Sequence, residues 1–195
     1  MRSMTERRRA RIEQVLRHRQ KDLTLVLANI HDPHNVSAIY RSCDAFGVAS
    51  VHLYYTTCAF PALSKKTSAS ARKWVDTVRH DDRESLFAAL RARPCQVLAT
   101  SCTPSARPVG DYDFTKPTAI IIGNEHAGVP EELIPHVDGE VYIPMFGMIQ
   151  SFNVSVAAAL MLAEASRQRR EAGMYERMSW TNEEYAERLA LWLEK

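Results

Sequence analysis

The stretch Thr118-Ala119-Ile120-Ile121-Ile122, which Gly123 follows, decides the fold of this chain. It is almost wholly apolar, as the strands of a parallel sheet are when both of their faces are covered. Similar short apolar runs lie before and after it, and segments with helical spacing separate them. Strands that alternate with helices predict an α/β fold with a mostly parallel sheet.

The other elements follow from the same patterns. We expect further strands at residues 23–30, 50–55, 74–78, 96–101 and 140–145. We expect helices around Ile12 and at residues 35–46, 82–93, 151–170 and 182–194, and a loop or short helix in the polar stretch 56–73. The chain then divides into a basic helical N-terminal extension (1–22), a central α/β domain (23–172) and a C-terminal helical extension (173–195).

The composition is that of an ordinary globular protein, with 195 residues of which 46% are apolar and 25% are charged. The apolar run 156–163 is far too short for a membrane span, and residues 1–20 are too polar for a secretory signal. Neither the cysteines nor the histidines show the C-x-x-C or H-E-x-x-H spacing of a metal site. We therefore expect a cytoplasmic protein with no membrane segment and no metal.

Positive charge is concentrated at the N-terminus. Residues 1–20 hold seven arginines and two acidic residues, although the net charge of the whole chain is only +2. A basic segment on a mildly acidic body indicates a polyanionic partner, with nucleic acid as the first candidate and an anionic membrane surface as the second. A merely solvated basic helix is the alternative.

Three loops that follow strands carry polar side chains, and such loops form the ligand crevice of a parallel sheet. The first is 29–41, where a helix that begins near Asn35 would point its free N–H groups at the crevice. The second is 123–130, which has the glycine spacing of a phosphate loop but Val129 in place of the lysine, so an ATPase is excluded. No G-x-G-x-x-G occurs either, which disfavours a dinucleotide-dependent dehydrogenase.

The third loop is 143–159, with the sequence IPMFGMIQSFNVSVAAA. Ser151 is a suitable N-cap for the helix that follows, and Asn153 in the first turn is free to face a ligand. The alanines at the end of the loop let another backbone approach closely. A capped core helix would explain Ser151 and the alanines, but not the pairing of Gln150 with Asn153 in an apolar loop.

Together these loops resemble the three motifs of the SpoU (TrmH) family of SPOUT RNA 2′-O-methyltransferases. Asn29 to Arg41 reads N-x-x-x-x-x-N-x-S-x-x-x-R, Gly123 to Gly128 reads G-x-E-x-x-G, and Ile143 to Ala159 reads I-P-M-x-G-x-x-x-S-x-N-V-S-x-A-x-A. The third motif is highly specific, and its one departure is Phe152, where leucine is usual. The motifs span most of the chain between the two extensions.

The resemblance implies a C-terminal trefoil knot in the sheet, a homodimer with the site at the subunit interface, and S-adenosylmethionine as cofactor. It implies that the cofactor is held by Thr100, Gly123, Ile143, Met148 and Ser151. It assigns the catalytic centre to Asn35, Arg41, Glu125, Ser151 and Asn153, and RNA contacts to Arg8, Arg9, Arg11, Arg19 and His34.

The activity that the resemblance implies is 2′-O-methylation of a tRNA ribose, with guanosine 18 of the D-loop as the expected nucleotide because both extensions resemble those of the family members that modify it. Another tRNA or rRNA nucleotide, or a non-catalytic RNA-binding protein on the same scaffold, is the alternative. The basic N-terminus disfavours a small-molecule enzyme. In the expected mechanism Asn35 positions Arg41, which stabilises the developing alkoxide, while Ser151 and Asn153 orient the ribose.

Overall fold

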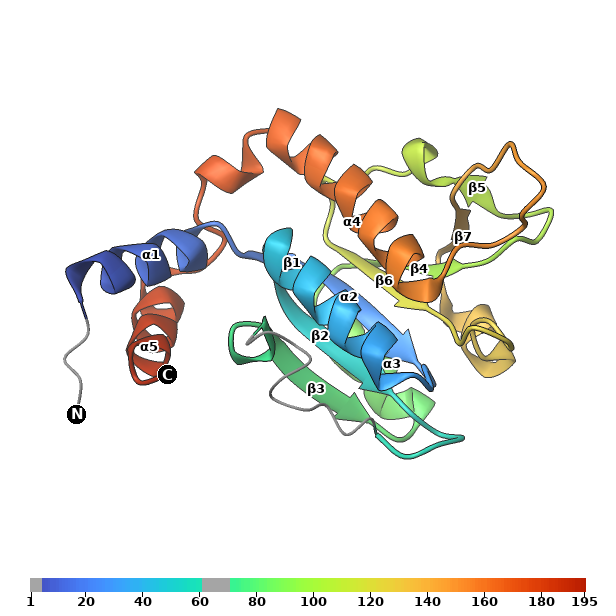
Figure 1. Ribbon diagram of the computed structural model, residues 1–195, viewed down its shortest axis with the longest axis horizontal. Helices are drawn as coiled ribbons and strands as arrows, with labels where there is room; N and C mark the ends of the chain where they lie inside the picture. The colour runs from blue at the N-terminus through green and yellow to red at the C-terminus, as the bar shows by residue number, and fades with distance from the viewer. Residues whose placement is uncertain (1–4, 61–70) are drawn as a thin grey trace.

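The computed structural model describes residues 5–60 and 71–195, so part of the polar stretch 56–73 lies outside the described residues. Within them, a seven-stranded sheet has the order β3-β2-β1-β6-β4-β7-β5 (Figure 1). Every pair of neighbouring strands is parallel, which confirms the predicted α/β fold. The strands are β1 (Gln20–Ala28), β2 (Val48–Tyr54), β3 (Asp76–His80), β4 (Gln96–Thr100), β5 (Arg107–Pro108), β6 (Thr118–Ile122) and β7 (Gly139–Tyr142). The trefoil knot stays a prediction from the resemblance.

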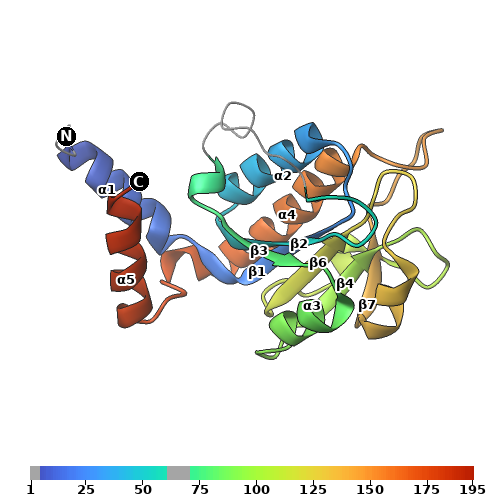
Figure 2. The same ribbon diagram turned by 90° about the horizontal axis from the view of Figure 1, so that it is seen from below.

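Helices cover both faces of the sheet. Figure 2 shows α2 and α4 side by side on one face and α3 on the other, while α1 and α5 lie together beyond the end of the sheet. The α-helices are α1 (Glu6–Arg17), α2 (Pro33–Ala45), α3 (Arg83–Leu90), α4 (Val154–Glu171) and α5 (Asn182–Leu193), and short 3-10 helices lie at Ala71–Lys73, Val109–Asp111, Glu131–His136 and Met174–Glu176. No helix in the described part of the chain is long and apolar enough to cross a bilayer.

Two helices begin at residues other than those predicted, because a different side chain caps each of them. Helix α2 begins before Asn35, since the Asp32 carboxylate accepts a hydrogen bond from the His34 N–H at 2.8 Å. Helix α4 begins three residues after Ser151, because the Asn153 side chain accepts the Ser155 N–H at 2.9 Å. Both caps supply acceptors to N–H groups that have no partner inside their helix.

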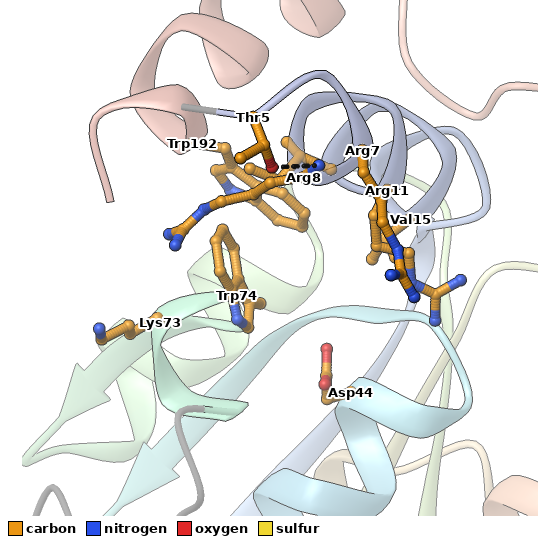
Figure 3. A pocket seen from close by; sticks show the side chains of 10 residues that line it. Thr5, Arg7, Arg8, Arg11, Val15, Asp44, Lys73, Trp74 and Trp192 are labelled. Carbon is orange, nitrogen blue, oxygen red and sulfur yellow. Dashed lines mark hydrogen bonds between the residues drawn. The ribbon is translucent and has the colours of Figure 1, made fainter. Parts of the chain in front are cut away.

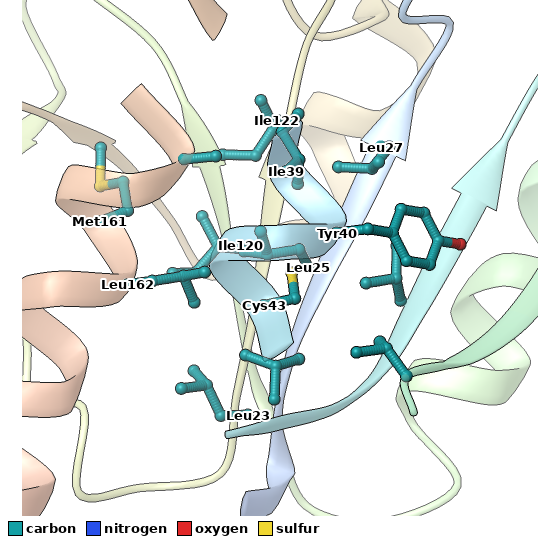
Figure 4. Packing of buried hydrophobic residues seen from close by; sticks show 14 of the residues in the cluster. Leu23, Leu25, Leu27, Ile39, Tyr40, Cys43, Ile120, Ile122, Met161 and Leu162 are labelled. Atoms are coloured by element: carbon teal, nitrogen blue, oxygen red, sulfur yellow. The ribbon is translucent and has the colours of Figure 1, made fainter. Parts of the chain in front are cut away.

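The main core lies between the sheet and the pair α2 and α4 (Figure 4). Successive residues of β1 point to opposite faces, so Leu25 and Leu27 pack under α2 and α4 whereas Val26 packs toward α3. Residues Ile120 and Ile121 of β6 alternate in the same way. Burial on both faces explains why these strands read as continuous apolar runs.

The two extensions supply most of a third core, to which Ala49 of β2 also belongs. Ile12 and Leu16 of α1 pack with Trp180 and with Trp192 of α5, and the Trp180 indole N–H donates to the Leu16 carbonyl oxygen at 3.1 Å. The predicted apolar face of the C-terminal helix therefore has a partner, which is the N-terminal helix.

Arg19 differs from its predicted role. Its side chain is fully buried, where it forms an ion pair with Asp44 and donates to the Val48 carbonyl oxygen at 3.0 Å. The prediction that Arg19 contacts RNA is therefore wrong for this fold, because the guanidinium is already enclosed between the start of β1 and the end of α2.

Candidate functional site

The loops that carry the sequence motifs meet at one edge of the sheet. Strands β1, β6, β4 and β7 are neighbours in the sheet, and because all are parallel their carboxyl ends lie at that edge. The loops after β4, β6 and β7 enclose a cavity of about 320 Å³. Of the predicted cofactor-binding residues, four line this cavity: Thr100, Gly123, Ile143 and Ser151. Met148 does not line it, since its side chain is 98% exposed.

Gly123 allows the loop after β6 to close tightly. A Cβ atom at this position would lie 2.1 Å from the Gly128 carbonyl carbon and 2.2 Å from the Val129 nitrogen. The Asn124 and Gly128 backbones exchange two hydrogen bonds, of 2.9 and 3.0 Å, across the same turn. The turn therefore presents backbone to the cavity at a place where any larger residue would push it open.

Three of the predicted catalytic residues form one hydrogen-bonded chain beside the cavity. The Asn35 side-chain amide donates to the Glu125 carboxylate at 2.7 Å, and the Asn153 side-chain amide donates to the Asn35 side-chain oxygen at 3.1 Å. These residues come from the first turn of α2, the loop after β6 and the N-cap of α4. The second Glu125 oxygen has no hydrogen bond with the described residues, so it remains available to a ligand.

Two further asparagines, neither of which was predicted as a site residue, fix the backbone of the loops that carry this chain. Asn29 follows β1 in a left-handed conformation (φ 51°), and its side-chain oxygen accepts the backbone N–H groups of Thr56 and Thr57. The buried Asn124 donates to the Asn29 carbonyl oxygen at 2.7 Å and accepts the N–H groups of the residues after Glu125. Asparagine tolerates positive φ and its side chain bonds backbone groups in turns. An asparagine directly after a strand could therefore have indicated these two positions in the sequence.

Arg41 is not part of the hydrogen-bonded chain. It is exposed on α2 and makes no hydrogen bond or ion pair with any described residue. Six positions along a helix correspond to about 9 Å of rise and a rotation of roughly 240°, so Arg41 and Asn35 point in different directions. The predicted contact by which Asn35 positions Arg41 is therefore not made within this chain. Arg41 instead shares the outer face of α2 with His34, which is also exposed.

The walls of the cavity suit a cationic ligand with an apolar body. Apolar side chains that include Ile122, Val141 and Met161 line much of it. Among the described lining residues Glu125 is the only acid, and no lysine or arginine is present. No group of histidine, cysteine and acidic side chains in the described parts of the chain could hold a metal ion.

The predicted RNA-contacting arginines lie away from this cavity. Arg8, Arg9 and Arg11 are exposed on α1, at the opposite end of the molecule from the loop between β7 and α4 (Figure 1). Arg9 forms an ion pair with Glu13 at 3.0 Å, and Arg11 donates to the Gln14 side chain at 3.0 Å. Both contacts are exposed, so neither prevents binding to another partner.

Comparison with known proteins supports the assignment that the motifs predicted. Residues 22–163 match the model of the SpoU rRNA Methylase family. The whole chain is 49% identical to the tRNA (guanosine(18)-2′-O)-methyltransferase of Thermus thermophilus, over 195 residues and 100% of both proteins. The A. aeolicus TrmH/SpoU tRNA modifying enzyme has a crystal structure that is similar with a TM-score of 0.90 and 38% identity, over 97% of this chain and 96% of that one.

A further solved structure contains the cofactor that the motifs imply. The SpoU methyltransferase AviRb from Streptomyces viridochromogenes, in complex with AdoMet, is similar with a TM-score of 0.71 and 29% identity, over 78% of this chain and 62% of that one. Motifs, family model and fold agree, and the chain therefore belongs to the SpoU methylase family.

Proposed function

We propose that this protein transfers a methyl group from S-adenosylmethionine to the 2′-hydroxyl of a tRNA ribose, and that the nucleotide is guanosine 18. The observation that carries the proposal is the chain Asn153–Asn35–Glu125, which lies beside a cavity where an acid is the only charged side chain among the described lining residues. A relative that is 49% identical over its full length is named for this reaction.

The cavity fits the cofactor by size and by charge. Its volume of about 320 Å³ is within the range of small-molecule sites. A sulfonium is a cation, and Glu125 gives the cavity the complementary charge, while the tight turn at Gly123 brings backbone groups to the wall. When bound, S-adenosylmethionine supplies an electrophilic methyl group with a good leaving group, so the protein's main task is to position the hydroxyl.

The polar residues at the mouth of the cavity orient the ribose. Asn35 fixes Glu125 on one side and accepts from Asn153 on the other, so each of these side chains is held in one orientation. Ser151 is exposed at the cavity rim, where its hydroxyl can contact the sugar. Arg41 keeps its positive charge and stabilises the negative charge that develops on the ribose oxygen as the hydroxyl proton passes to water.

The reactive site is completed by a second subunit. The loop 145–149 and the outer face of α4 expose large apolar side chains, with Phe146 and Met148 almost fully exposed and Ile149, Val156 and Leu160 partly so. Exposed apolar side chains on two neighbouring segments favour a symmetric dimer that covers them. Arg41 lies on α2, which packs beside α4, and in such a dimer it acts on the site of the partner subunit. We place this reaction in the cytoplasm.

Subunit mixing tests the dimer and the position of Arg41 together. Arg41→Ala and Asn35→Asp should each be inactive, the second because it places a carboxylate against Glu125. If Arg41 acts across the interface, a mixed dimer contains one intact site, and an equal mixture regains about a quarter of the wild-type activity. A mixture that stays inactive, although mixed dimers form, would show that Arg41 acts within its own subunit.

Methyl transfer itself is tested with a defined RNA. Purified protein, methyl-labelled S-adenosylmethionine and a tRNA transcript should yield label on the ribose of nucleotide 18. A transcript with a 2′-deoxy nucleotide at that position should yield none. Label at another ribose would keep the enzyme class and change the substrate. Binding of tRNA without any label would favour the non-catalytic alternative and contradict the proposal.

A further inference from the structure

A second cavity lies far from the methyl-transfer site, between α1 and the segment that precedes β3 (Figure 3). We call it the α1 groove, and its volume is about 620 Å³. Its lining includes Arg7, Arg8 and Arg11 from α1 together with Lys73, Trp74 and Trp192. Neither Lys73 nor Trp74 belongs to the sequence motifs, and nothing in the proposed reaction uses them.

The groove carries an excess of positive charge that its own residues do not neutralise. Arg7, Arg8, Arg11 and Lys73 are all exposed. The one acid in the lining is Asp44, and its carboxylate is already paired with the buried Arg19. The cations lie on opposite walls, three on α1 and one on the 3-10 helix before β3, so an anionic chain between them would be contacted from both sides.

Trp74 places an aromatic ring among these cations. Its side chain is only half-buried, and it packs against the Trp192 ring at a centroid distance of 5.0 Å and an angle of 60°. In Figure 3 the side chains of Arg8 and Lys73 extend on one side of Trp74, and those of Arg7 and Arg11 lie on the other. A partly exposed aromatic ring between cations is the combination that single-stranded nucleic acids bind, by stacking of bases and by contacts to phosphates.

Buried side chains form the base of the α1 groove. Trp192 is only 3% exposed and belongs to the core that joins α1 to α5. The guanidinium of Arg19 lies 5.5 Å from the centre of the Trp192 ring, and the Lys195 ammonium donates to the Lys73 carbonyl oxygen. The ring of Trp74 is therefore supported from below by buried groups, which reduces the entropic cost of ordering it when a base stacks.

We propose that the α1 groove binds an unpaired segment of the RNA substrate, in which one base stacks on Trp74 while the flanking phosphates contact Arg7, Arg11 and Lys73. This inference rests on the proposed function, because it takes the substrate to be RNA. Asp44 at the end of α2 borders the groove and Asn35 near its start belongs to the methyl-transfer site, so these two residues are about 14 Å apart along the helix that links the two sites. One RNA can therefore occupy both.

Binding to a short oligonucleotide tests the stacking. The probe is a single-stranded RNA pentamer, compared with the same pentamer lacking its central base. The wild-type protein should bind the intact pentamer about tenfold more tightly, as expected for one stacked base. Trp74→Leu should lose this preference, whereas Trp74→Phe should keep part of it. Thermal unfolding of both variants shows that the fold is retained. A preference that is the same in Trp74→Leu as in the wild type would overturn the proposal.

The salt dependence of tRNA binding tests the phosphate contacts. The slope of log K against log salt is negative, and each contact to single-stranded RNA contributes about −0.7 to it. Removing Arg7 and Arg11 together should therefore make the slope less negative by about 1.4. Arg83→Ala on α3 removes a partly exposed cation, paired with Glu84, on the other face of the sheet and should leave the slope unchanged. Equal slopes for the groove variant and the Arg83 variant would refute the assignment.

These assays need neither cofactor nor turnover, so they separate this inference from the proposed function. If the wild type binds the pentamer through Trp74 but methylates no RNA, the groove is an RNA site and the proposed reaction is wrong. If the wild type methylates tRNA and Trp74→Leu changes nothing, the reaction stands and the groove assignment fails. Binding to phosphatidylserine vesicles with none to the pentamer would assign the groove to a membrane surface and overturn the proposal.

Discussion

The substitution Gly123→Ala should damage the cofactor cavity while the rest of the chain stays folded. The added Cβ would lie 2.1 Å from a backbone carbon, against at least 3.4 Å for an ordinary contact, so the turn between Gly123 and Gly128 must open by more than about 1 Å. Overpacking of this kind costs about 1–3 kcal/mol. The two backbone hydrogen bonds across the turn contribute roughly 0.5–1.5 kcal/mol each, and they are lost as well.

The expected loss of stability is therefore about 2–6 kcal/mol, which lowers the Tm by roughly 4–24 °C for a chain of this size. Because the displaced turn is a wall of the cavity, the affinity for S-adenosylmethionine should fall at least about tenfold, a change that calorimetric titration measures directly. The variant should remain folded at 25 °C, since the strands of the main core do not include the turn.

Gly110→Ala is the matched control. It makes the same chemical change, but a Cβ at Gly110 would meet nothing within 4 Å. The control should bind cofactor normally and gain up to about 1 kcal/mol, because alanine lowers the entropy of the unfolded chain. If Gly123→Ala bound the cofactor as tightly as Gly110→Ala does, the cavity would not be the cofactor site.

Three further variants test single groups. Arg41→Ala should lower the rate of methylation by about 10²–10³-fold, as the loss of one charge-stabilising donor does, without changing cofactor affinity; normal activity would exclude this role. Arg169→Met leaves Asp22 and several carbonyl oxygens without their buried partner, and should cost about 3–5 kcal/mol in urea unfolding, so an unchanged midpoint would contradict its structural role. Burial and the neighbouring His80 lower the pKa of His52 to about 4, below its unfolded value near 6.5, so the native state binds fewer protons and stability falls between pH 6.5 and 4. His52→Phe should reduce that loss by about 2–3 kcal/mol, and an identical pH dependence in the two proteins would disprove the assignment.

The strands could be predicted because their residues are apolar on both faces, as Ile120 and Ile121 show. Helix starts were less accurate, because capping depends on which side chain reaches the free N–H groups. Ser151 and Asn153 are both good caps by type, and only the path of the loop places Asn153 at the helix and leaves Ser151 at the cavity rim.

The site was predictable only in part. The spacing of the motifs identified Asn35, Glu125 and Asn153. It did not show which of these residues are in contact, because the hydrogen bonds join residues 90 and 118 positions apart in the sequence. It could not show that Arg41 faces away from Asn35. The resemblance also assigned Arg19 to RNA, although here this arginine is buried against a carboxylate and carbonyl oxygens, a pairing that motif spacing does not reveal.

The RNA-binding role proposed for α1 depends on the opposite end of the chain. Helix α1 has only 12 residues, a length at which an isolated helix is marginal in water. Its apolar residues Ile12 and Leu16 are buried only because Trp180 and Trp192 cover them. Without the C-terminal extension these residues would be exposed and the helix would fray, so the arginines on its other side would lose their fixed spacing. A basic N-terminal segment and an amphipathic C-terminal helix, which look independent in the sequence, therefore form one binding element.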